Sequence, residues 1–312
     1  RNGIRSVIYM PDGAPISKVE ATKQLGAEVC LVKGVYDDAY AKAIQVQEET
    51  GATFIHPFDD EEVIAGQGTI GLEILDSLEG VDAVIVPVGG GGLISGVACA
   101  VKNLRPDIKV YGVQAAGSAS MFESRRAGEA ITLETAATFA DGIAVKHPGD
   151  ITYQMVNQYV DDIVTVSEDE IAAAILALLE KQKVIAEGAG AVSTAAVLFD
   201  KLPVREKKVV SIVSGGNIDV NILSRVIPRG LVTSGRNVNL TIALTDKPGQ
   251  LQDVSEIIAS CGGNVVAVYH DRSDANMAIT SCYLKLGLET RDFEQIQLIE
   301  SELTKAGFHL VS

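Results

Sequence analysis

Tryptophan is absent from the sequence, and aromatic residues make up only 5% of its 312 residues, although hydrophobic residues make up 47%. A core with few aromatic rings must be filled by small and branched aliphatic side chains, which is typical of α/β proteins. A chain of this length favours about two domains. The four cysteines, Cys30, Cys99, Cys261 and Cys282, lie scattered in or beside apolar segments. Their spacing matches neither a disulfide framework nor a metal site, so we expect buried reduced thiols, as in a cytoplasmic protein.

Positive charge is also scarce. The chain has 26 Lys and Arg against 41 Asp and Glu, a net charge of −15 at pH 7, and no basic cluster is longer than Lys207-Lys208. Nucleic acid is therefore not an expected partner. The uncharged run from Ala83 to Val101 is long enough for a membrane span, but Pro87 and several glycines interrupt it, and a buried strand before a buried helix gives the same hydropathy. The chain shows no secretory leader, so we expect a cytoplasmic location and no membrane partner.

Strands and helices are predicted to alternate through the first two thirds of the chain. Strands are expected at residues 6–10, 28–32, 83–86, 109–113 and 209–213 and ending at 54–55, and helices at residues 16–25, 37–50, 69–78 and 93–104. Alternation at this spacing favours βαβ units around a parallel sheet. Ser167 and Glu170 have the spacing of a capping box and predict the start of a further helix.

Two of these strands run into glycine turns. The first turn and the start of the following helix comprise Gly89, Gly90, Gly91, Gly92 and Leu93. Consecutive glycines leave the backbone N–H groups unobstructed, and the helix adds the positive end of its dipole, which suits this turn to a phosphate group. The second turn presents Ser214 where its strand ends. Parallel strands open both turns at one carboxyl edge, where ligands bind, so the pair predicts one cofactor held at two ends.

Alternatives to a phosphate cradle fit the glycine run less well. A glycine run after a strand can be an ordinary tight turn, but four glycines lower stability and need a reason. A dinucleotide site fits poorly, because Gly90, Gly92 and Ser95 only approximate the G-x-G-x-x-G spacing and the next strand ends in Gln114, not in an acidic residue. The Gly-Lys-Ser/Thr of a P-loop is missing as well.

The two turns, together with further segments, resemble the threonine dehydratases (threonine ammonia-lyases) of the fold type II pyridoxal phosphate enzymes. The likeness is carried by residues 10–18, 63–73, 84–96, 140–142, 160–163, 187–190 and 209–217. It implies parallel sheets with helices on both faces and pyridoxal 5'-phosphate as the cofactor. It also implies α,β-elimination of threonine or serine to 2-oxobutanoate or pyruvate and ammonia, in amino-acid catabolism or isoleucine biosynthesis, by a homodimer or homotetramer.

The resemblance also implies roles for single residues. The glycine turn would hold the cofactor phosphate, and the Ser214 hydroxyl would meet the pyridine nitrogen. A neutral hydroxyl cannot keep that nitrogen protonated as a carboxylate would, which favours elimination over reactions that need a long-lived carbanion. Gly142 and Glu187 would lie near the active site. Ser214 as an ordinary strand-end serine and Glu187 as a helix-start carboxylate remain the alternatives.

The chain departs from the family pattern in two places. The Ser-Phe-Lys-type motif with the Schiff-base lysine and the Ser-x-Gly-Asn-His-type substrate loop are not in this sequence. We therefore assign no catalytic residue and expect that a segment carrying both motifs precedes Arg1. Relatives that bind a divalent cation, such as serine racemases, carry Glu and Asp where this chain has Gln114 and Ser120. Hard cations need anionic oxygen ligands, so no divalent metal site is expected here, and a monovalent ion on backbone carbonyls stays open.

A different pattern follows residues 229–237, which are polar and rich in turn formers and are predicted to form a linker. Strands are expected at residues 240–244, 265–270, 277–286 and 308–311, and helices at residues 251–258 and 293–305. This βαββαβ order is ferredoxin-like, and its Asp-x-Pro-Gly-x-Leu turn and Gly-Gly-Asn-Val-Val run resemble an ACT domain, an amino-acid-sensing module. The expected domains are residues 1–228 for the catalytic domain, of which about 1–55 form a small subdomain, and residues 238–312 for the allosteric regulatory domain.

The turn that begins at Asp246 leads directly into a helix, whose first N–H groups can bind the carboxylate of an amino acid. An ordinary strand-to-helix turn has the same Pro and Gly, but the resemblance to an ACT domain favours an effector site. Its predicted residues are Asp246, Gly249, Gln250 and Asn264. Two further functions stay open: a serine dehydratase or racemase of the same fold, and a catalytically empty regulator that binds amino acids.

Overall fold

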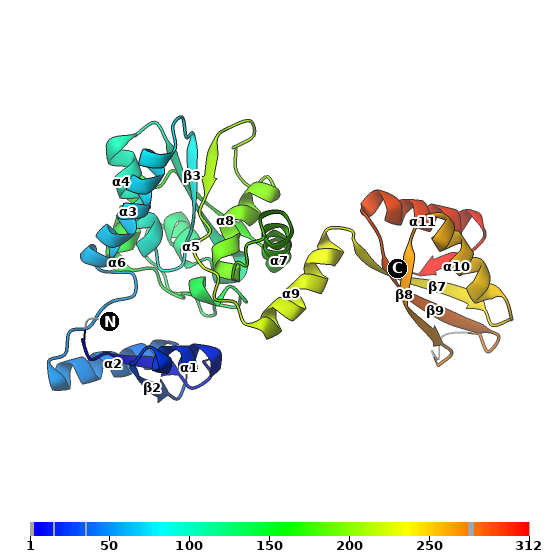
Figure 1. Cartoon of the computed structure of the whole chain (residues 1–312), viewed down its shortest axis with the longest axis horizontal. Helices are drawn as coiled ribbons and strands as arrows, with labels where there is room; N and C mark the ends of the chain where they lie inside the picture. The colour runs from blue at the N-terminus through cyan, green and yellow to red at the C-terminus, as the bar shows by residue number, and fades with distance from the viewer. Residues whose placement is uncertain (1–2, 15, 35, 274–277, 312) are drawn as a thin grey trace.

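The computed structural model describes residues 3–14, 16–34, 36–273 and 278–311. The N-terminal part contains the smallest sheet, in which strands β1 (Val7–Pro11) and β2 (Glu28–Val32) pair in parallel. Helices α1 (Ile16–Gln24) and α2 (Tyr36–Thr50) follow these strands, as the alternation predicted (Figure 1). The strand expected to end at residues 54–55 is wrong: these residues have irregular backbone, and no described strand pairs with them.

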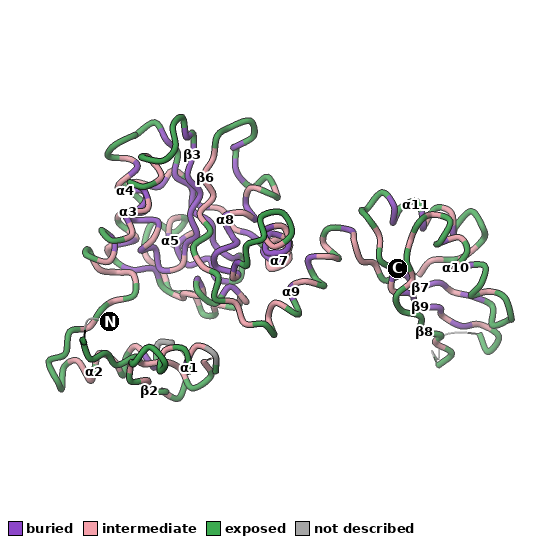
Figure 2. Tube along the Cα trace, viewed as in Figure 1, coloured by how far each residue is buried: buried purple, intermediate pink, exposed green. Residues whose placement is uncertain are grey.

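The central sheet has four parallel strands in the order β5-β4-β3-β6. They are β3 (Ala83–Pro87), β4 (Lys109–Ala115), β5 (Asp162–Val166) and β6 (Val209–Ser211). All five residues of β3 are buried, and Figure 2 shows buried chain running through the middle of this part. A short, continuously apolar strand of this kind is buried on both faces, which confirms the predicted parallel sheet.

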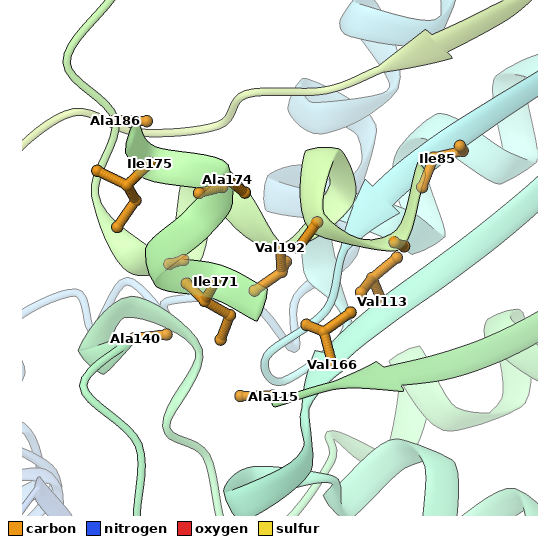
Figure 3. Close-up of a cluster of buried hydrophobic side chains, with 14 of the residues drawn as sticks. Ile85, Val113, Ala115, Ala140, Val166, Ile171, Ala174, Ile175, Ala186 and Val192 are labelled. Carbon is orange, nitrogen blue, oxygen red and sulfur yellow. The ribbon is translucent and has the colours of Figure 1, made fainter. Parts of the chain in front are cut away.

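Helices cover both faces of the central sheet. One face packs on α3 (Glu61–Ser77), α4 (Gly92–Leu104) and α6 (Asp150–Tyr159), and the other on α7 (Glu168–Ala177) and α8 (Gly188–Leu198). Alternate residues of β3 enter different cores: Ile85 lies with Val192 and Ile171 in one, and Val84 and Val86 lie in the other. Figure 3 shows the first core, with side chains of the strands meeting those of α7 and α8. The period of two follows from the pleat of the strand.

Several element boundaries differ from the predicted ones. Helix α3 begins at Glu61 and not at residue 69, because the Asp60 carboxylate accepts hydrogen bonds from the Glu62 and Val63 N–H groups and caps the helix there. The capping box of Ser167 and Glu170 is confirmed.

No helix among the described residues is both long and apolar enough to span a membrane.

Helix α9 (Val220–Thr233) corrects the predicted linker. Residues 229–233 form its last turns, so only residues 234–236 separate it from the next strand. The helix buries Val226 and Gly230, and Gly230 lies so close to Leu176 of α7 that an added Cβ would be 3.1 Å from the Leu176 Cβ. Packing against α7 thus keeps this polar segment helical despite Pro228. Figure 1 shows α9 between the central sheet and the C-terminal part.

The C-terminal part has the predicted βαββαβ order. Its elements are β7 (Asn237–Thr245), α10 (Gln250–Ser260), β8 (Asn264–Asp271), β9 (Ser281–Glu289), α11 (Phe293–Lys305) and β10 (His309–Val311). The sheet is antiparallel in the order β10-β7-β9-β8, which is the ferredoxin-like arrangement. Ile242, Leu284, Ile258 and Ile299 fill the core between the sheet and both helices. The helical period of residues 293–305 predicts that Phe293 points inward with Ile296 and Ile299, but Phe293 is 54% exposed. Met277, the first residue of the strand expected at residues 277–286, lies outside the described residues.

Candidate cofactor site

The glycine turn after β3 carries backbone N–H groups that have no partner among the described residues. Gly90, Gly91 and Gly92 are buried or nearly so, and in the described part of the chain no protein group accepts a hydrogen bond from the N–H groups of residues 89–94. The turn opens α4 at Gly92, and the first N–H groups of a helix have no acceptor within the helix. Buried and unpaired N–H groups at the positive end of a helix form a site for an anion.

The glycines themselves are explained by packing against the protein. A Cβ at Gly90 would overlap the Phe58 ring, and one at Gly92 would lie 2.8 Å from the Phe58 carbonyl oxygen. Gly91 has φ +104°, and its added Cβ would lie 2.7 Å from Met121 Cε. At these three positions neighbouring residues already exclude a side chain, and the approach of a phosphate to the open N–H groups stays a prediction.

Two neighbouring segments hold the turn in place. The Gly90 carbonyl accepts hydrogen bonds from Thr152 Oγ1 at 2.6 Å and from the Gly149 N–H at 3.2 Å, both at the start of α6. Asp59 in turn accepts hydrogen bonds from the Asp150 and Thr152 N–H groups, each at 3.0 Å. The start of α6 is thus capped by a carboxylate from a distant segment, and this cap also fixes the turn.

A histidine shapes the segment that carries this carboxylate. The His56 Nδ1 atom accepts hydrogen bonds from the Phe58 N–H at 3.2 Å and from the Asp59 N–H at 2.7 Å. Burial lowers the pKa of His56, although the nearby Asp59 and Asp60 carboxylates act in the opposite direction. Nδ1 can accept these hydrogen bonds only when it carries no proton, so this turn requires the neutral imidazole ring. A cavity of about 550 Å³ lies beside it and is lined by Phe58, Asp59 and Gly149, among others.

The second turn lies beside the glycine turn because β6 and β3 are neighbours. The Ile212 N–H donates to the Ile85 carbonyl at 3.0 Å, which continues the pairing past the end of β6 toward Ser214. Ser214 is exposed and makes no hydrogen bond in the described part of the chain. Its hydroxyl is therefore available to a ligand at the edge where β3 ends.

Gly142 and Glu187 join this edge as predicted. The Glu187 N–H donates to the Gly215 carbonyl at 3.1 Å, and a Cβ added at Gly215 would overlap the Glu187 carboxylate. A Cβ added at Gly142 would lie 3.4 Å from Glu187 Oε1, and one at Gly89 would lie 3.5 Å from the Gly142 carbonyl oxygen. Glu187 therefore stands between the loop of Gly142 and the second turn. All predicted residues of the cofactor site lie around one position on the carboxyl edge.

Comparison with known proteins agrees with this geometry. Residues 1–215 match the family described as pyridoxal-phosphate dependent enzyme. The chain belongs to this family.

Curated relatives extend the match beyond that region. The chain is 51% identical to an L-threonine ammonia-lyase of Thermotoga maritima over 308 residues, 99% of this chain and 77% of that protein. It is 45% identical to an L-threonine ammonia-lyase of Geobacter sulfurreducens over 306 residues, 98% of this chain and 76% of that protein. A catabolic L-threonine dehydratase of Escherichia coli is 50% identical over 226 residues, 72% of this chain and 69% of that protein.

Solved structures of the family superpose on the chain. The processed form of threonine deaminase isoform 2 from Solanum lycopersicum has a TM-score of 0.68 at 39% identity and covers 72% of this chain and 66% of that chain. Maize serine racemase has a TM-score of 0.67 at 37% identity and covers 74% of this chain and 71% of that chain. The fold type II architecture predicted from the sequence is thereby confirmed.

The residues present fit pyridoxal phosphate. Its phosphate is a dianion that needs several donors in a fixed arrangement, and the N–H groups of the glycine turn are donors without an acceptor. The ring needs a partner for its nitrogen at a second point, and Ser214 offers an unengaged hydroxyl on the neighbouring turn. The donor set therefore matches both ends of this cofactor.

Polar residues at the end of β4 and directly after it are buried. Gln114 Oε1 accepts a hydrogen bond from the Phe122 N–H at 2.8 Å, and Ser118 Oγ lies 3.4 Å from the Ile143 carbonyl oxygen. Gln114 Nε2 and Ser120 Oγ are buried and have no hydrogen-bond partner within the described ranges of the chain. None of these three side chains carries a charge, and the only ligands they offer are neutral.

Sequence reasoning missed the residues that support the glycine turn. Phe58, Asp59, Met121 and Thr152 hold it from two sides, yet they lie far from it in sequence. The signal available was the Asp59-Asp60 pair before an apolar helical pattern, because such residues commonly cap helices. Nothing in that pattern indicates that Asp59 caps α6 and not α3.

The predicted effector residues separate in the structure. Asp246, Gly249 and Gln250 line one cavity of about 330 Å³ at the start of α10. Asn264 lies at the other end of the sheet, opposite Glu289, and its amide donates to the Glu289 carboxylate at 2.9 Å. Within one chain Asn264 therefore lies outside this cavity, and its part in an effector site stays a prediction.

Proposed function

We propose that the enzyme containing this chain is an L-threonine ammonia-lyase, which converts threonine to 2-oxobutanoate and ammonia and serine to pyruvate and ammonia. The observation that carries the proposal is the unpaired N–H set of the glycine turn next to the free hydroxyl of Ser214. The relatives named as L-threonine ammonia-lyases support the substrate, because they match 99% and 98% of this chain.

The protein residues have separate tasks in this reaction. Bound pyridoxal phosphate supplies an electron sink for the charge that develops on the substrate Cα. The N–H groups of the glycine turn hold the phosphate by dipoles that are already oriented, so no reorganisation is needed during the reaction. Ser214 offers a neutral hydroxyl to the ring nitrogen, which limits the strength of the sink and favours departure of the β-hydroxyl over a long-lived carbanion.

A serine racemase is the main alternative, because solved racemase structures superpose well on this chain. Gln114 and Ser120 argue against it, since they place neutral side chains where the resemblance to racemases would require the carboxylates of a divalent cation site. Without such a site, we expect elimination to dominate.

Substitution of Ser214 tests the proposed chemistry. Ser214→Ala is expected to lower 2-oxobutanoate release from threonine by roughly fivefold, since one hydrogen bond to the cofactor is worth about 1 kcal/mol. Ser214→Asp is expected to increase exchange of the Cα proton with deuterated water relative to elimination, because a carboxylate strengthens the sink. Ser224→Ala, on the exposed side of α9, is the matched control. Racemisation of serine without any 2-oxobutanoate from threonine would contradict the proposal.

For the C-terminal part we propose a regulatory ACT-type module formed by residues 238–312, attached to a catalytic domain formed by residues 1–228, with about 1–55 as its small subdomain. Two relatives match this module along with the rest of the chain. The proposed effector is an amino acid bound at Asp246, Gly249 and Gln250, where the helix start can hold its carboxylate.

Assembly and location complete the proposal. We place the enzyme in the cytoplasm as a homodimer or homotetramer whose ligands are small molecules. Strand β8 lies at the edge of its sheet, and its Val266 and Val268 side chains are 56% and 50% exposed, which supports contact with another copy of the module. The four cysteines are free, in agreement with a reducing compartment.

A further inference from the structure

Three side chains of different chemistry converge at one end of the C-terminal sheet. Asp246, His270 and Cys282 each bring one ligand atom, an oxygen, a nitrogen and a sulfur, within 4.8 Å of one another. Asp246 directly follows β7, His270 stands near the end of β8, and Cys282 is the second residue of β9. Among the described residues this is the one cluster of three such groups.

The register of the sheet explains the convergence. Strand β9 lies between β7 and β8, with Cys282 opposite Leu244 and Leu284 opposite His270. The Asp246 N–H donates to the Thr280 carbonyl at 2.8 Å, so the pairing of β7 with the segment before β9 continues to Asp246. Residues two apart on a strand share a face, and diagonal neighbours on adjacent strands are within reach of long side chains. The three side chains are therefore neighbours on the face that the helices cover.

The closest pair among them is buried on one side. His270 Nε2 lies 2.8 Å from Cys282 Sγ, and Cys282 is only 1% exposed. With the Asp246 carboxylate also within 4.8 Å, three donor atoms of different type converge on one point.

We propose that Asp246, His270 and Cys282 bind a borderline-soft divalent transition metal ion, of which Zn²⁺ is the representative. A thiolate, an imidazole and a carboxylate are the three ligand types that zinc uses, whereas Mg²⁺ and Ca²⁺ prefer oxygen ligands alone. Three protein ligands leave one position of a tetrahedral ion for water or another ligand. Asp246 and His270 both line the cavity of about 330 Å³, which gives the ion a path from solvent.

One cation already competes for the carboxylate. Arg272 forms an ion pair with Asp246, with Nε 2.9 Å from Oδ2 and Nη2 3.0 Å from Oδ1. The Arg272 side chain is 64% exposed, so it can turn into solvent, and exposed ion pairs contribute little to stability. Removal of Arg272 should therefore increase the affinity for the metal ion. If His270 and Cys282 only formed a hydrogen bond with each other, removal of Arg272 would have no such effect.

Metal titration of the purified chain tests the site. Zn²⁺ followed by calorimetry is expected to bind once per chain, and Co²⁺ is expected to give thiolate-to-metal charge-transfer absorption in the near ultraviolet. Cys282→Ser should abolish that absorption. His270→Gln should weaken Zn²⁺ binding by at least about 100-fold, beyond the roughly 10–100-fold loss that an outer-shell partner causes. Arg272→Ala should strengthen it. Cys261→Ser and His309→Gln, in the same module, are the matched controls and should bind as the original chain does.

The outcomes separate the proposal from a purely structural contact. His270 is exposed, so His270→Gln should fold even if Cys282→Ser does not, and its far-ultraviolet circular dichroism checks this. Zn²⁺ affinity that is unchanged in folded His270→Gln, or Co²⁺ binding without charge-transfer absorption, would overturn the proposal and leave the pair as a hydrogen bond. These readouts do not depend on turnover, so they stand apart from the test of the ammonia-lyase activity.

Discussion

Gly91 combines a left-handed backbone conformation with close packing around its Cα. Its φ of +104° disfavours any L-residue, and an added Cβ would lie 2.7 Å from Met121 Cε and 2.8 Å from Thr152 Cβ. We expect Gly91→Ala to destabilise the chain by roughly 1–3 kcal/mol, in the range of overpacked cores, and to weaken pyridoxal phosphate binding at least tenfold by displacing the N–H groups. Denaturant unfolding and a cofactor titration measure the two effects.

Gly66→Ala is the matched control for this substitution. Gly66 lies in α3 with nothing within 4 Å of an added Cβ, so alanine should raise helix stability by up to about 1 kcal/mol. Cofactor affinity should not change. A Gly91→Ala chain that binds the cofactor as tightly as the original would show that the turn does not hold the phosphate.

His56 predicts a specific response to pH. The folded state lowers its pKa below the ordinary value of about 6.5, so the unfolded chain binds the proton more readily. The stabilisation is therefore complete above about pH 6.5 and is lost as the pH falls toward the lower folded pKa. Protonation would also remove the Nδ1 acceptor that orders Phe58 and Asp59.

We expect His56→Gln to lose less unfolding free energy than the original chain between pH 7 and pH 5. Several carboxylates and histidines titrate in this interval, so the comparison is between the two pH profiles and not with a flat line. His309→Gln, on the short strand β10, serves as the control and should follow the original profile. Identical profiles for His56→Gln and the original chain would rule out this role of His56.

The residues proposed to bind the cofactor could be located from the sequence, whereas the residues that support them could not. Gly89 to Gly92 and Ser214 follow strands of strong apolar pattern, and parallel strands bring their ends to one edge. Phe58 and Met121 contact the turn only because of the way distant segments pack. The exclusion of a Cβ at these glycines by neighbouring residues could not be predicted either, because a local pattern does not reveal what occupies the space around Cα.

Helix α6 depends on a cap from outside its own segment. Its own N-cap residue, Gly149, has no side chain, and Asp59 accepts the Asp150 and Thr152 N–H groups instead. We expect Asp59→Ala to lower the unfolding free energy by about 1–2 kcal/mol, the upper part of the range for lost N-caps. Because Thr152 donates to Gly90, cofactor affinity should fall as well.

Asp60→Ala is the control that separates the loss of stability from the loss of cofactor affinity. Asp60 caps α3 through the Glu62 and Val63 N–H groups and has no contact with α6 among its hydrogen bonds. Its loss should reduce stability by a similar amount with little effect on cofactor affinity. Equal cofactor affinity in both variants would mean that α6 does not position the glycine turn.

Elements with a strong apolar period were predicted most closely. Strand β2 and helix α11 have the predicted boundaries, since each combines a clear period with defined ends. The prediction of a linker at residues 229–237 was wrong. It rested on a polar, turn-rich composition, whereas residues 229–233 continue α9, whose Val226 and Gly230 pack on α7. Tertiary packing there outweighs the local preference of Pro and Gly, and no local signal contains that information.

The order of strands and helices along the chain was enough to predict both sheets. The cluster of side chains at one end of the second sheet could not be predicted, because it depends on the register of the strands. Alternation of strands and helices predicted the parallel sheet, and the βαββαβ order predicted the antiparallel one. Asp246, His270 and Cys282 have no metal-site spacing in the sequence and meet only through the pairing of β7, β8 and β9. Clusters of this kind require the pairing partners of each residue, which periodicity does not provide.

The proposed coupling between the C-terminal module and the catalytic domain has a short physical route. Residues 234–236 join α9 to β7, and Arg236 forms an ion pair with Glu180 beside α7 at 2.5 Å. The Thr290 N–H and hydroxyl donate to the Arg236 and Gly235 carbonyls at 2.9 and 2.7 Å. A change in the module can therefore reach α7 and α9, which pack in the core next to β4 and β5.

If the module senses an amino acid, binding of isoleucine or valine near Asp246 and Gly249 must change the apparent affinity for threonine, because coupling between two sites is reciprocal. We expect a coupling of about 1–3 kcal/mol, or roughly 5–150-fold. Arg236→Ala should reduce it without abolishing effector binding. Arg205→Ala removes another exposed ion pair, with Asp200, and should leave the coupling unchanged.

Calorimetry with each branched amino acid and threonine saturation curves with and without it measure the two halves of this linkage. Effector heat in Arg236→Ala with a reduced shift in the threonine curve would support the route through Glu180 and α7. The absence of heat for every amino acid, together with unchanged saturation curves, would remove the sensing role. The module would then act only in assembly, because the exposed apolar residues of β8 need a partner whether or not an effector binds.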